Sequence, residues 1–450
     1  MGFVIAAALL LGGQDLRWSF DGDAGPHAEV KGRAEYRVSA VAGKALVCNG
    51  VDTRVELKLP SAPKSLALWF YACEPVDAAL AGPLRITKDG RLSSGTVSTA
   101  PGRVYPGQWI HAAVVDGELF LNGESVGRGG ASDVGARLTL GAPPFRGLLD
   151  QVQAGERLDP AALAEALPWY RPRPHRREPF PAGRFVLEPG DTVALLGGEN
   201  MVGLGEAGHL ETTLLLAGPK ELRLRSLAWE GDTVFEQRRD LNFGPWSRYL
   251  ERSGATVLFV QFGAMEALRG GGDFVASYDR LLGQLRERTK RVVVLSPTRF
   301  EKKPPPLPDL SARNADLAKI VEACRATARA HDCLFVDLSG LELPTRDGVH
   351  LTDDGQKAVA REIARQLGIV EPPTETAAVE TLRSAVREKN RLWFDHWRPM
   401  NWAFLEGDRT EQASSRDHVD RALRWFPLEI QDFLPLIRDA ETRIEKARAR

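Results

Sequence analysis

Five short apolar runs alternate with helical patterns between residues 185 and 370, and this alternation constrains the fold more than any other feature of the chain. The runs lie at residues 191–196, 222–227, 257–261, 291–297 and 334–338. The alanine and leucine spacing between the last two runs is typical of an amphipathic helix. Strand–helix alternation predicts a mainly parallel, doubly wound α/β sheet. In such a sheet, the loops after the carboxyl ends of the strands converge on the ligand site.

Two of these loops carry side chains that suit hydrolytic chemistry. Asp347 lies three residues before His350 on one short loop. Its carboxylate can therefore orient the imidazole and fix its tautomer, as a hydrolase base requires. The first apolar run is followed by Gly198, Glu199 and Asn200, where a partner nucleophile is expected. That position offers a carboxylate and no serine.

Together these segments resemble the SGNH (GDSL-type) hydrolase superfamily over about residues 185–370, which implies a flavodoxin-like sheet and four sequence blocks. The family's first block carries the serine nucleophile, and Glu199 stands at that position here. In the second block, Gly231 matches the glycine whose N–H binds the oxyanion. In the third block, Met265 replaces an asparagine that is the other oxyanion donor. The last block, the Asp–His loop, is intact.

These replacements argue against the standard serine-esterase mechanism. A covalent acyl intermediate needs a hydroxyl or thiol that His350 can deprotonate, and Glu199 is ionised at neutral pH without any base. Met265 cannot donate a hydrogen bond to an oxyanion, and losing one such donor costs about 10²–10³ in rate. We therefore expect an ester hydrolase-type domain with altered catalytic groups, in which Asp347 orients His350 as the base.

The other expected site residues follow from the same resemblance. Gly231 would supply an oxyanion donor, Glu199 or Glu266 would take a new catalytic role, and Gly198, Asn200 and Met265 would lie in the cleft. Each glutamate could instead cap the helix that follows it, or the two could form the carboxylate pair of a glycosidase. The alternative function is a non-catalytic pseudohydrolase that binds carbohydrate or protein.

Residues 15–165 predict an all-β sandwich, because short apolar runs are separated by glycine-bearing turns. Asp116-Gly117 and Asn122-Gly123 are favoured hairpin turns. The segment resembles laminin-G-like and concanavalin-A-like jelly rolls, which often bind glycans. The cues for that resemblance are residues 18–22, 43–46, 108–111, 119–123 and 145–152. Trp69 and Trp109 sit within apolar runs, so we expect both to be buried and not to form a sugar platform.

Three further segments flank these domains. Residues 1–14 resemble the apolar core of a secretory signal peptide, which predicts a secreted, periplasmic or cell-surface protein; the alternative is a buried first strand in a cytoplasmic one. Residues 166–184 form a Pro/Arg-rich linker. Residues 371–450 predict a mainly helical extension that is too aromatic to be disordered. Similar extensions accompany SGNH-like domains in multidomain bacterial proteins.

The composition of the chain limits the classes of partner that it is expected to bind. A net charge of −1 gives no general attraction to nucleic acid. Four cysteines in 450 residues do not form a disulfide framework, and no cluster has a metal-ligand spacing. We expect no cofactor, no metal and no integral membrane segment. The expected partner is a glycan or an acylated glycan.

Overall fold

The computed structural model describes residues 15–131, 133–165, 176, 178–237, 245–370, 376–405 and 409–448. The leader predicted at residues 1–14 and most of the linker predicted at 166–184 lie outside these ranges. The chain divides into two compact units. Unit 1 comprises Met1–Pro172 and Arg416–Asp432, and unit 2 comprises Arg173–Ser415 and Phe433–Arg450. The C-terminal part of the chain therefore contributes to both units.

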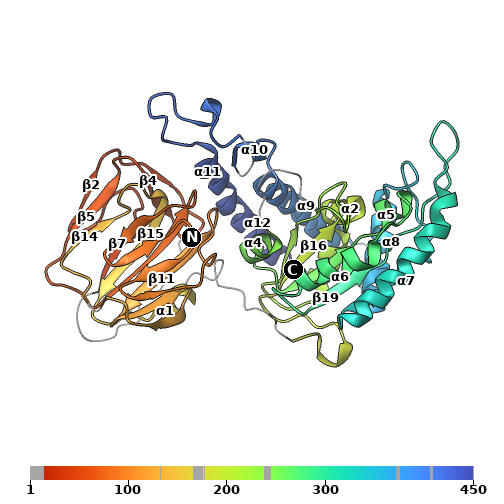
Figure 1. Cartoon of the computed structure of the whole chain (residues 1–450), viewed down its shortest axis with the longest axis horizontal. Coiled ribbons are helices and arrows are strands. Elements are labelled where there is room, and N and C mark those ends of the chain that lie inside the picture. The colour runs from red at the N-terminus through yellow and green to blue at the C-terminus, as the bar shows by residue number, and fades with distance from the viewer. Residues whose placement is uncertain are drawn as a thin grey trace. The chain divides into compact units, whose positions relative to one another are not determined.

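Unit 1 contains two antiparallel sheets, as the sequence predicted (Figure 1). One sheet has the order β13-β12-β11-β6-β15-β4-β3, with β1 paired to β15, and the other has the order β10-β9-β8-β7-β14-β5-β2. The strands are β1 (Leu16–Trp18), β2 (Ala28–Lys31), β3 (Tyr36–Val38), β4 (Lys44–Asn49), β5 (Arg54–Lys58), β6 (Ser65–Ala72), β7 (Ala78–Ala81), β8 (Leu84–Ile86), β9 (Leu92–Ser94), β10 (Val97–Ser98), β11 (Trp109–Val115), β12 (Glu118–Leu121), β13 (Glu124–Arg128), β14 (Arg137–Leu140) and β15 (Arg146–Gly155).

The two faces of β6 show how the sequence builds this unit. Leu66, Leu68 and Phe70 belong to the core between the sheets, and the alternate residues point to the opposite face because side chains along a strand alternate. Trp69 on that outer face is 2% exposed, as is Trp109 on β11. The prediction that both tryptophans are buried is therefore confirmed.

Two segments that follow the last strand of this unit in the sequence lie on this outer face. Helix α1 (Pro160–Glu165) follows β15, and its Leu163 packs with Ala67 and Ala113. The Tyr71 hydroxyl donates to the Pro427 carbonyl over 3.4 Å. Pro427 belongs to α11 (Phe426–Glu429), which the short helix Ile430–Asp432 follows. The C-terminal part of unit 1 thus packs on its larger sheet.

Unit 2 contains a five-stranded parallel sheet, as predicted from the strand–helix alternation. Its order is β17-β16-β18-β19-β20, which is 2-1-3-4-5 when the strands are counted along the chain. This is the flavodoxin-like doubly wound order, whose ligand site lies beyond the carboxyl ends of the first and third strands. The strands are β16 (Thr192–Gly197), β17 (Arg223–Ser226), β18 (Val257–Gln261), β19 (Val292–Leu295) and β20 (Leu334–Val336).

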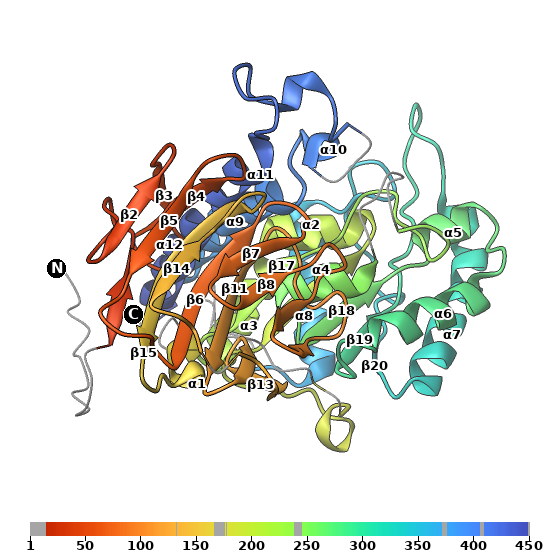
Figure 2. The same cartoon turned by 60° about the vertical axis from the view of Figure 1, so that its left-hand side comes forward.

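The helices of unit 2 form two packed groups. Helices α2, α3 and α9 contact one another and α8 contacts α2 and α3, whereas α5 and α6 contact α7, and α4 contacts α6 (Figure 2). Their bounds are α2 (Glu199–Ala207), α3 (His209–Ala217), α4 (Trp246–Ser253), α5 (Ala264–Leu268), α6 (Phe274–Leu285), α7 (Asn314–Ala330), α8 (Asp353–Leu367), α9 (Ala377–Trp397), α10 (Trp402–Leu405) and α12 (Phe433–Arg448). The mainly helical C-terminal part is thereby confirmed.

Buried charges join the C-terminal helices to the sheet. Arg225 on β17 pairs with Glu441 on α12 over 2.5 Å, and Lys389 on α9 pairs with Glu211 on α3 over 2.7 Å. The Trp393 indole donates to the Ser226 carbonyl over 2.8 Å. These contacts make α9 and α12 an integral part of unit 2.

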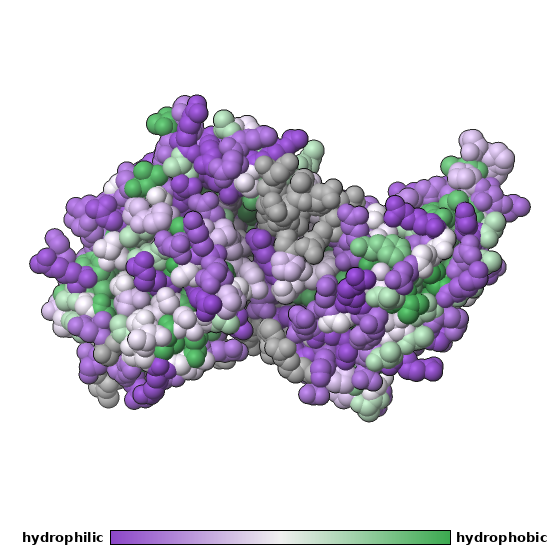
Figure 3. Space-filling view, in the orientation of Figure 1, coloured by the Kyte–Doolittle hydropathy of each residue, from purple (hydrophilic) through white to green (hydrophobic). Residues whose placement is uncertain are grey.

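The face of the described residues that Figure 3 draws is mainly polar. Figure 3 shows apolar side chains scattered over the visible face among hydrophilic ones. No helix in the described ranges is both long enough and apolar enough to cross a membrane.

Candidate active site

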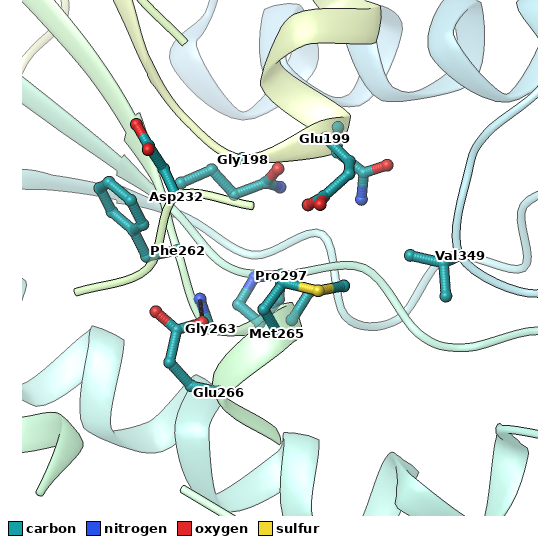
Figure 4. Close-up of a pocket in the computed structure, with 12 residues that line it drawn as sticks. Gly198, Glu199, Asp232, Phe262, Gly263, Met265, Glu266, Pro297 and Val349 are labelled. Atoms are coloured by element: carbon teal, nitrogen blue, oxygen red, sulfur yellow. Dashed lines mark hydrogen bonds between the residues drawn. The ribbon is translucent and has the colours of Figure 1, made fainter. Parts of the chain in front are cut away.

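A pocket lies beyond the carboxyl ends of β16, β18 and β19, where the topology places a ligand site. It encloses about 330 Å³, part of which is open to solvent. Figure 4 shows the residues around it, with Glu199 projecting from the start of α2. The lining residues are Gly198, Glu199, Asn200, Asp232, Gln261, Phe262, Gly263, Ala264, Met265, Glu266, Pro297 and Val349.

Gly197 determines how the chain leaves the end of β16 towards the pocket. Its φ is +145°, and a Cβ there would lie 2.2 Å from the carbonyl oxygen of Gln261 on the neighbouring strand. Only glycine tolerates both the dihedral angle and the close approach. The chain then enters α2 through Gly198, which places Glu199 at the first helical position.

Glu199 is the acidic residue in the first turn of α2. Its Oε1 accepts a hydrogen bond from the backbone N–H of Gly231 over 2.9 Å. Gly231 is the residue that the family resemblance assigned as an oxyanion donor. The side chain that the resemblance matches to the nucleophile thus accepts a hydrogen bond from the N–H that the resemblance assigns to the oxyanion.

The turn that presents Gly231 is fixed by the backbone on both sides. The Trp229 N–H donates to the Gly197 carbonyl over 3.0 Å, and the Asp232 N–H donates to the Trp229 carbonyl over 3.1 Å. Gly231 itself has φ +79°, which is the left-handed region that glycine adopts freely. We refer to residues 229–232 as the Gly231 turn.

Glu266 serves the helix cap that was the alternative to a catalytic role. It is 1% exposed; its Oε2 accepts from the Gly263 N–H over 2.8 Å and its Oε1 from the Val234 N–H over 2.7 Å. Burial raises the pKa of Glu266, and these two hydrogen bonds oppose the rise. The carboxylate holds the start of α5 against the chain that follows the Gly231 turn. Its neighbour Met265 presents a thioether to the pocket, where the family has an amide donor.

Asp347 and His350 form the expected pair. Asp347 Oδ2 lies 2.6 Å from His350 Nδ1, and its Oδ1 accepts from the backbone N–H groups of His350 and Val349 over 2.9 and 3.1 Å. Burial alone would raise the pKa of Asp347, but the hydrogen bonds from both backbone groups and from the imidazole outweigh it and lower the pKa to about 2. The carboxylate is therefore ionised and fixed beside the imidazole.

Most of the predicted site residues lie around the pocket, but the Asp347–His350 pair lies outside its lining. Gly198, Glu199, Asn200, Met265 and Glu266 line the pocket, and Gly231 reaches it through Glu199. Asp347 and His350 do not line it; their loop contributes Val349 instead. The His350 side chain is 50% exposed.

Sequence reasoning missed the residue that holds the Asp–His loop. Glu301 accepts hydrogen bonds from the N–H and hydroxyl of Thr345 over 2.7 and 2.6 Å, and its own N–H donates to the Gly348 carbonyl over 3.0 Å. Hydrogen bonds from Lys303 and Thr345 lower the pKa of Glu301 to about 2. Nothing in the local sequence marks a contact over 44 residues.

Other missed residues had a usable signal. Gln261, Phe262 and Pro297 line the pocket, and each lies at or just beyond the end of a predicted strand. Their positions at the ends of predicted strands are a signal in the sequence that the family motifs do not include. Within the described ranges, no group of three or more histidine, cysteine, aspartate or glutamate side chains could hold a metal ion.

Residues 198–358 match the GDSL-like Lipase/Acylhydrolase family. The chain therefore contains a GDSL-like acylhydrolase domain, and every pocket-lining residue lies within it. No curated protein matches the chain by sequence.

Several solved structures are similar to part of this chain. An acetylxylan esterase from Geobacillus stearothermophilus is 15% identical, with 41% of this chain and 98% of that chain covered and a TM-score of 0.33. A gut microbial diltiazem-metabolizing enzyme is 17% identical, with 41% of this chain and 49% of that chain covered and a TM-score of 0.32. This chain thus spans about half the length of that enzyme. A GDSL-like lipase from Parabacteroides merdae, named there as putative, is 14% identical over 42% of this chain and all of its own, with a TM-score of 0.31.

Proposed function

We propose that the GDSL-like domain is an ester hydrolase-type domain with altered catalytic groups, directed at carbohydrate or its acyl substituents. Asp347 orients His350 as general base, and no serine takes part. The observation that carries this proposal is the 2.6 Å contact between Asp347 Oδ2 and His350 Nδ1. In this proposal the Asp347 carboxylate holds the proton on Nδ1, and Nε2 acts as the base.

Without a hydroxyl nucleophile, the substrate of this base is water. His350 Nε2 takes a proton from water while the water oxygen attacks the ester carbonyl carbon. The bond between that carbon and the leaving alkoxide then breaks, and the imidazolium returns the proton to the alkoxide. Positioned general-base catalysis of this kind contributes about 10²–10⁴ in rate, so we expect slower turnover than a serine acylhydrolase achieves.

The pocket and the first domain support carbohydrate as the substrate class. Asn200, Asp232 and Phe262 all line the pocket, and polar groups together with an aromatic ring suit sugar hydroxyls and an apolar sugar face. We propose in addition that residues 15–165 form a laminin-G-like jelly roll, joined through a linker at 166–184 to the α/β domain at 185–370 and the extension at 371–450. The proposal also includes export of the protein to the periplasm, the cell surface or the medium.

A second candidate function is favoured by the Glu199–Gly231 hydrogen bond. A carboxylate that already occupies the oxyanion donor opposes the negative charge that develops in acyl transfer. In that case the domain is a pseudohydrolase that binds carbohydrate without turnover.

The experiment measures hydrolysis of acetylated glycans and aryl esters by the wild type, by His350→Ala and by His331→Ala. His331 is a matched control, because its Nε2 lies 2.8 Å from Asp279 in another surface His–Asp pair. We expect turnover by the wild type and by His331→Ala, and its loss in His350→Ala. Glycan binding by calorimetry without turnover in any of the three would establish the pseudohydrolase.

A further inference from the structure

The Gly231 turn is held from one side by an element outside the segment that matches the acylhydrolase family. Arg398 directly follows α9, forty residues beyond the end of the match at residue 358. Its guanidinium lies 4.2 Å from the centroid of the Trp229 ring, and its Nη2 lies 2.5 Å from Glu230 Oε2. Arg398 therefore contacts two consecutive residues of the turn, immediately before Gly231.

The position of Arg398 is itself fixed by aromatic packing. The guanidinium also lies 4.9 Å from the centroid of the Phe394 ring, one helical turn earlier on α9. A guanidinium between two aromatic faces is stabilised by cation–π attraction, and its planar shape suits the stack. The Arg398 side chain is 15% exposed, so solvent competes little for these contacts.

Two further tryptophans enclose the same ring. Trp397 and Trp402 meet Trp229 edge to face, at centroid distances of 5.9 and 6.3 Å. Trp397 also packs edge to face on Tyr249 of α4 at 5.5 Å. Trp229 is consequently 8% exposed. These contacts give the aromatic segment of the C-terminal extension a definite place against the Gly231 turn.

We propose that Arg398 is a positioning residue for the active site. By stacking on Trp229 and pairing with Glu230, it fixes the turn so that the Gly231 N–H faces the side chain at position 199. The extension is then a working part of the site, although none of its described residues lines the pocket. This inference rests on the proposed function only in assigning Gly231 as the donor to the reacting group.

Hydrogen exchange of the full chain, followed by mass spectrometry, tests the proposal without any need for turnover. Arg398→Ala removes both contacts, Arg398→Lys keeps the charge but not the planar stack, and Glu230→Gln weakens the ion pair from the turn side. Arg443→Ala is the matched control, because Arg443 forms a 2.9 Å pair with Glu388 between α12 and α9 in which both side chains are about half exposed.

We expect amides of residues 227–233 to exchange about tenfold faster in Arg398→Ala, since the turn opens locally once these contacts are lost. Arg398→Lys should recover part of the protection, and Arg443→Ala should match the wild type. Peptides from residues 345–352 should be unaffected in all four variants. In a Glu199→Ser background, Arg398→Ala should lower kcat with little change in KM, because a displaced donor weakens the transition state and not substrate binding.

Unchanged exchange of residues 227–233 in folded Arg398→Ala would overturn the proposal. If that variant does not fold, unchanged exchange in both Arg398→Lys and Glu230→Gln overturns it equally. A loosened turn in a protein that hydrolyses no ester would contradict the proposed function and leave the positioning role intact. Ester hydrolysis by the wild type, with unchanged exchange of residues 227–233 in Arg398→Ala, would support the proposed function and contradict the positioning role.

Discussion

At the scale of single residues, we expect Glu199 to limit the chemistry of the site. Its carboxylate accepts the Gly231 N–H over 2.9 Å, so Glu199→Ser would both free that donor and add a hydroxyl. We expect Glu199→Ser to raise the rate of aryl ester hydrolysis by about 10²-fold, the usual value of an oxyanion donor. Steady-state kinetics would measure the gain. Glu199→Gln, which keeps the shape without adding a nucleophile, should not show it; equal gains in both variants would contradict the argument.

Asp347 should matter through the orientation of the imidazole. Asp347→Asn removes the charge that fixes the Nδ1–H tautomer, and we expect a loss of about 10²–10⁴ in kcat with little change in KM. Because the pKa of Asp347 is lowered to about 2, this carboxylate stays ionised throughout mildly acidic conditions. Protonation of Asp347 should therefore make no contribution to the pH–rate profile in that range. An acid limb that disappears in Asp347→Asn, with kcat otherwise preserved, would contradict this assignment.

At this scale the sequence predicted residue types better than contacts. The Asp–His pair could be predicted, because both residues lie on one loop and their spacing limits their separation. The Glu199–Gly231 hydrogen bond could not be predicted, because the two residues are 32 positions apart. Glu199 and Glu266 were also both compatible with a helix cap. Arg398 was missed for the same reason, although the aromatic segment around it was predicted to pack.

Secondary-structure elements were predicted more completely than single contacts. The run at 191–196 became β16 at Thr192–Gly197, and the run at 334–338 became the shorter β20 at Leu334–Val336. Apolar periodicity identifies a buried strand, but its ends depend on backbone partners that the sequence does not reveal. The jelly-roll topology of the first domain stays a prediction.

The C-terminal helices should depend on their buried ion pairs. Lys389 is 1% exposed, its burial lowers its pKa, and its partner Glu211 is 4% exposed. We expect Lys389→Met to lower the free energy of unfolding by about 3 kcal/mol, because it leaves a buried carboxylate without its cation. Urea unfolding monitored by tryptophan fluorescence would measure this change.

Two controls separate this effect from the loss of any surface charge. Arg443→Ala, which removes the exposed pair with Glu388, should cost less than about 1 kcal/mol. The double variant Lys389→Met/Glu211→Leu should recover most of the stability, since an apolar replacement of a whole buried pair is often neutral. A double variant no more stable than Lys389→Met would contradict the explanation.

For the molecule as a whole, the pH dependence of stability should include a term from unit 1. Asp150 is fully buried, and burial raises its pKa to about 7 against hydrogen bonds from Ser39, Ala42 and Gln151. The folded protein therefore keeps this proton up to about pH 7, whereas the unfolded chain releases it near pH 4. This contribution to stability is present at low pH and is lost as the pH rises through that window.

Asp150→Asn should remove the loss of stability that accompanies deprotonation of Asp150. Relative to the wild type, we expect the variant to gain about 4 kcal/mol in the free energy of unfolding between pH 4 and pH 8. His111, whose pKa burial lowers to about 4, gives the opposite slope below its unfolded pKa, but it is present in both proteins and cancels. Calorimetric unfolding across this range would measure the difference. A constant difference between variant and wild type at all pH values would rule out titration of Asp150.

The most direct test of the account is the intact mass of the protein during hydrolysis of an acetyl ester, recorded beside its rate. Water attack assisted by His350 predicts multiple turnovers by the wild type with no acylated protein at any time. Glu199→Ser should instead accumulate an acyl group at position 199. Acylated wild-type protein during turnover would show a covalent nucleophile and contradict the account, and so would a complete absence of turnover.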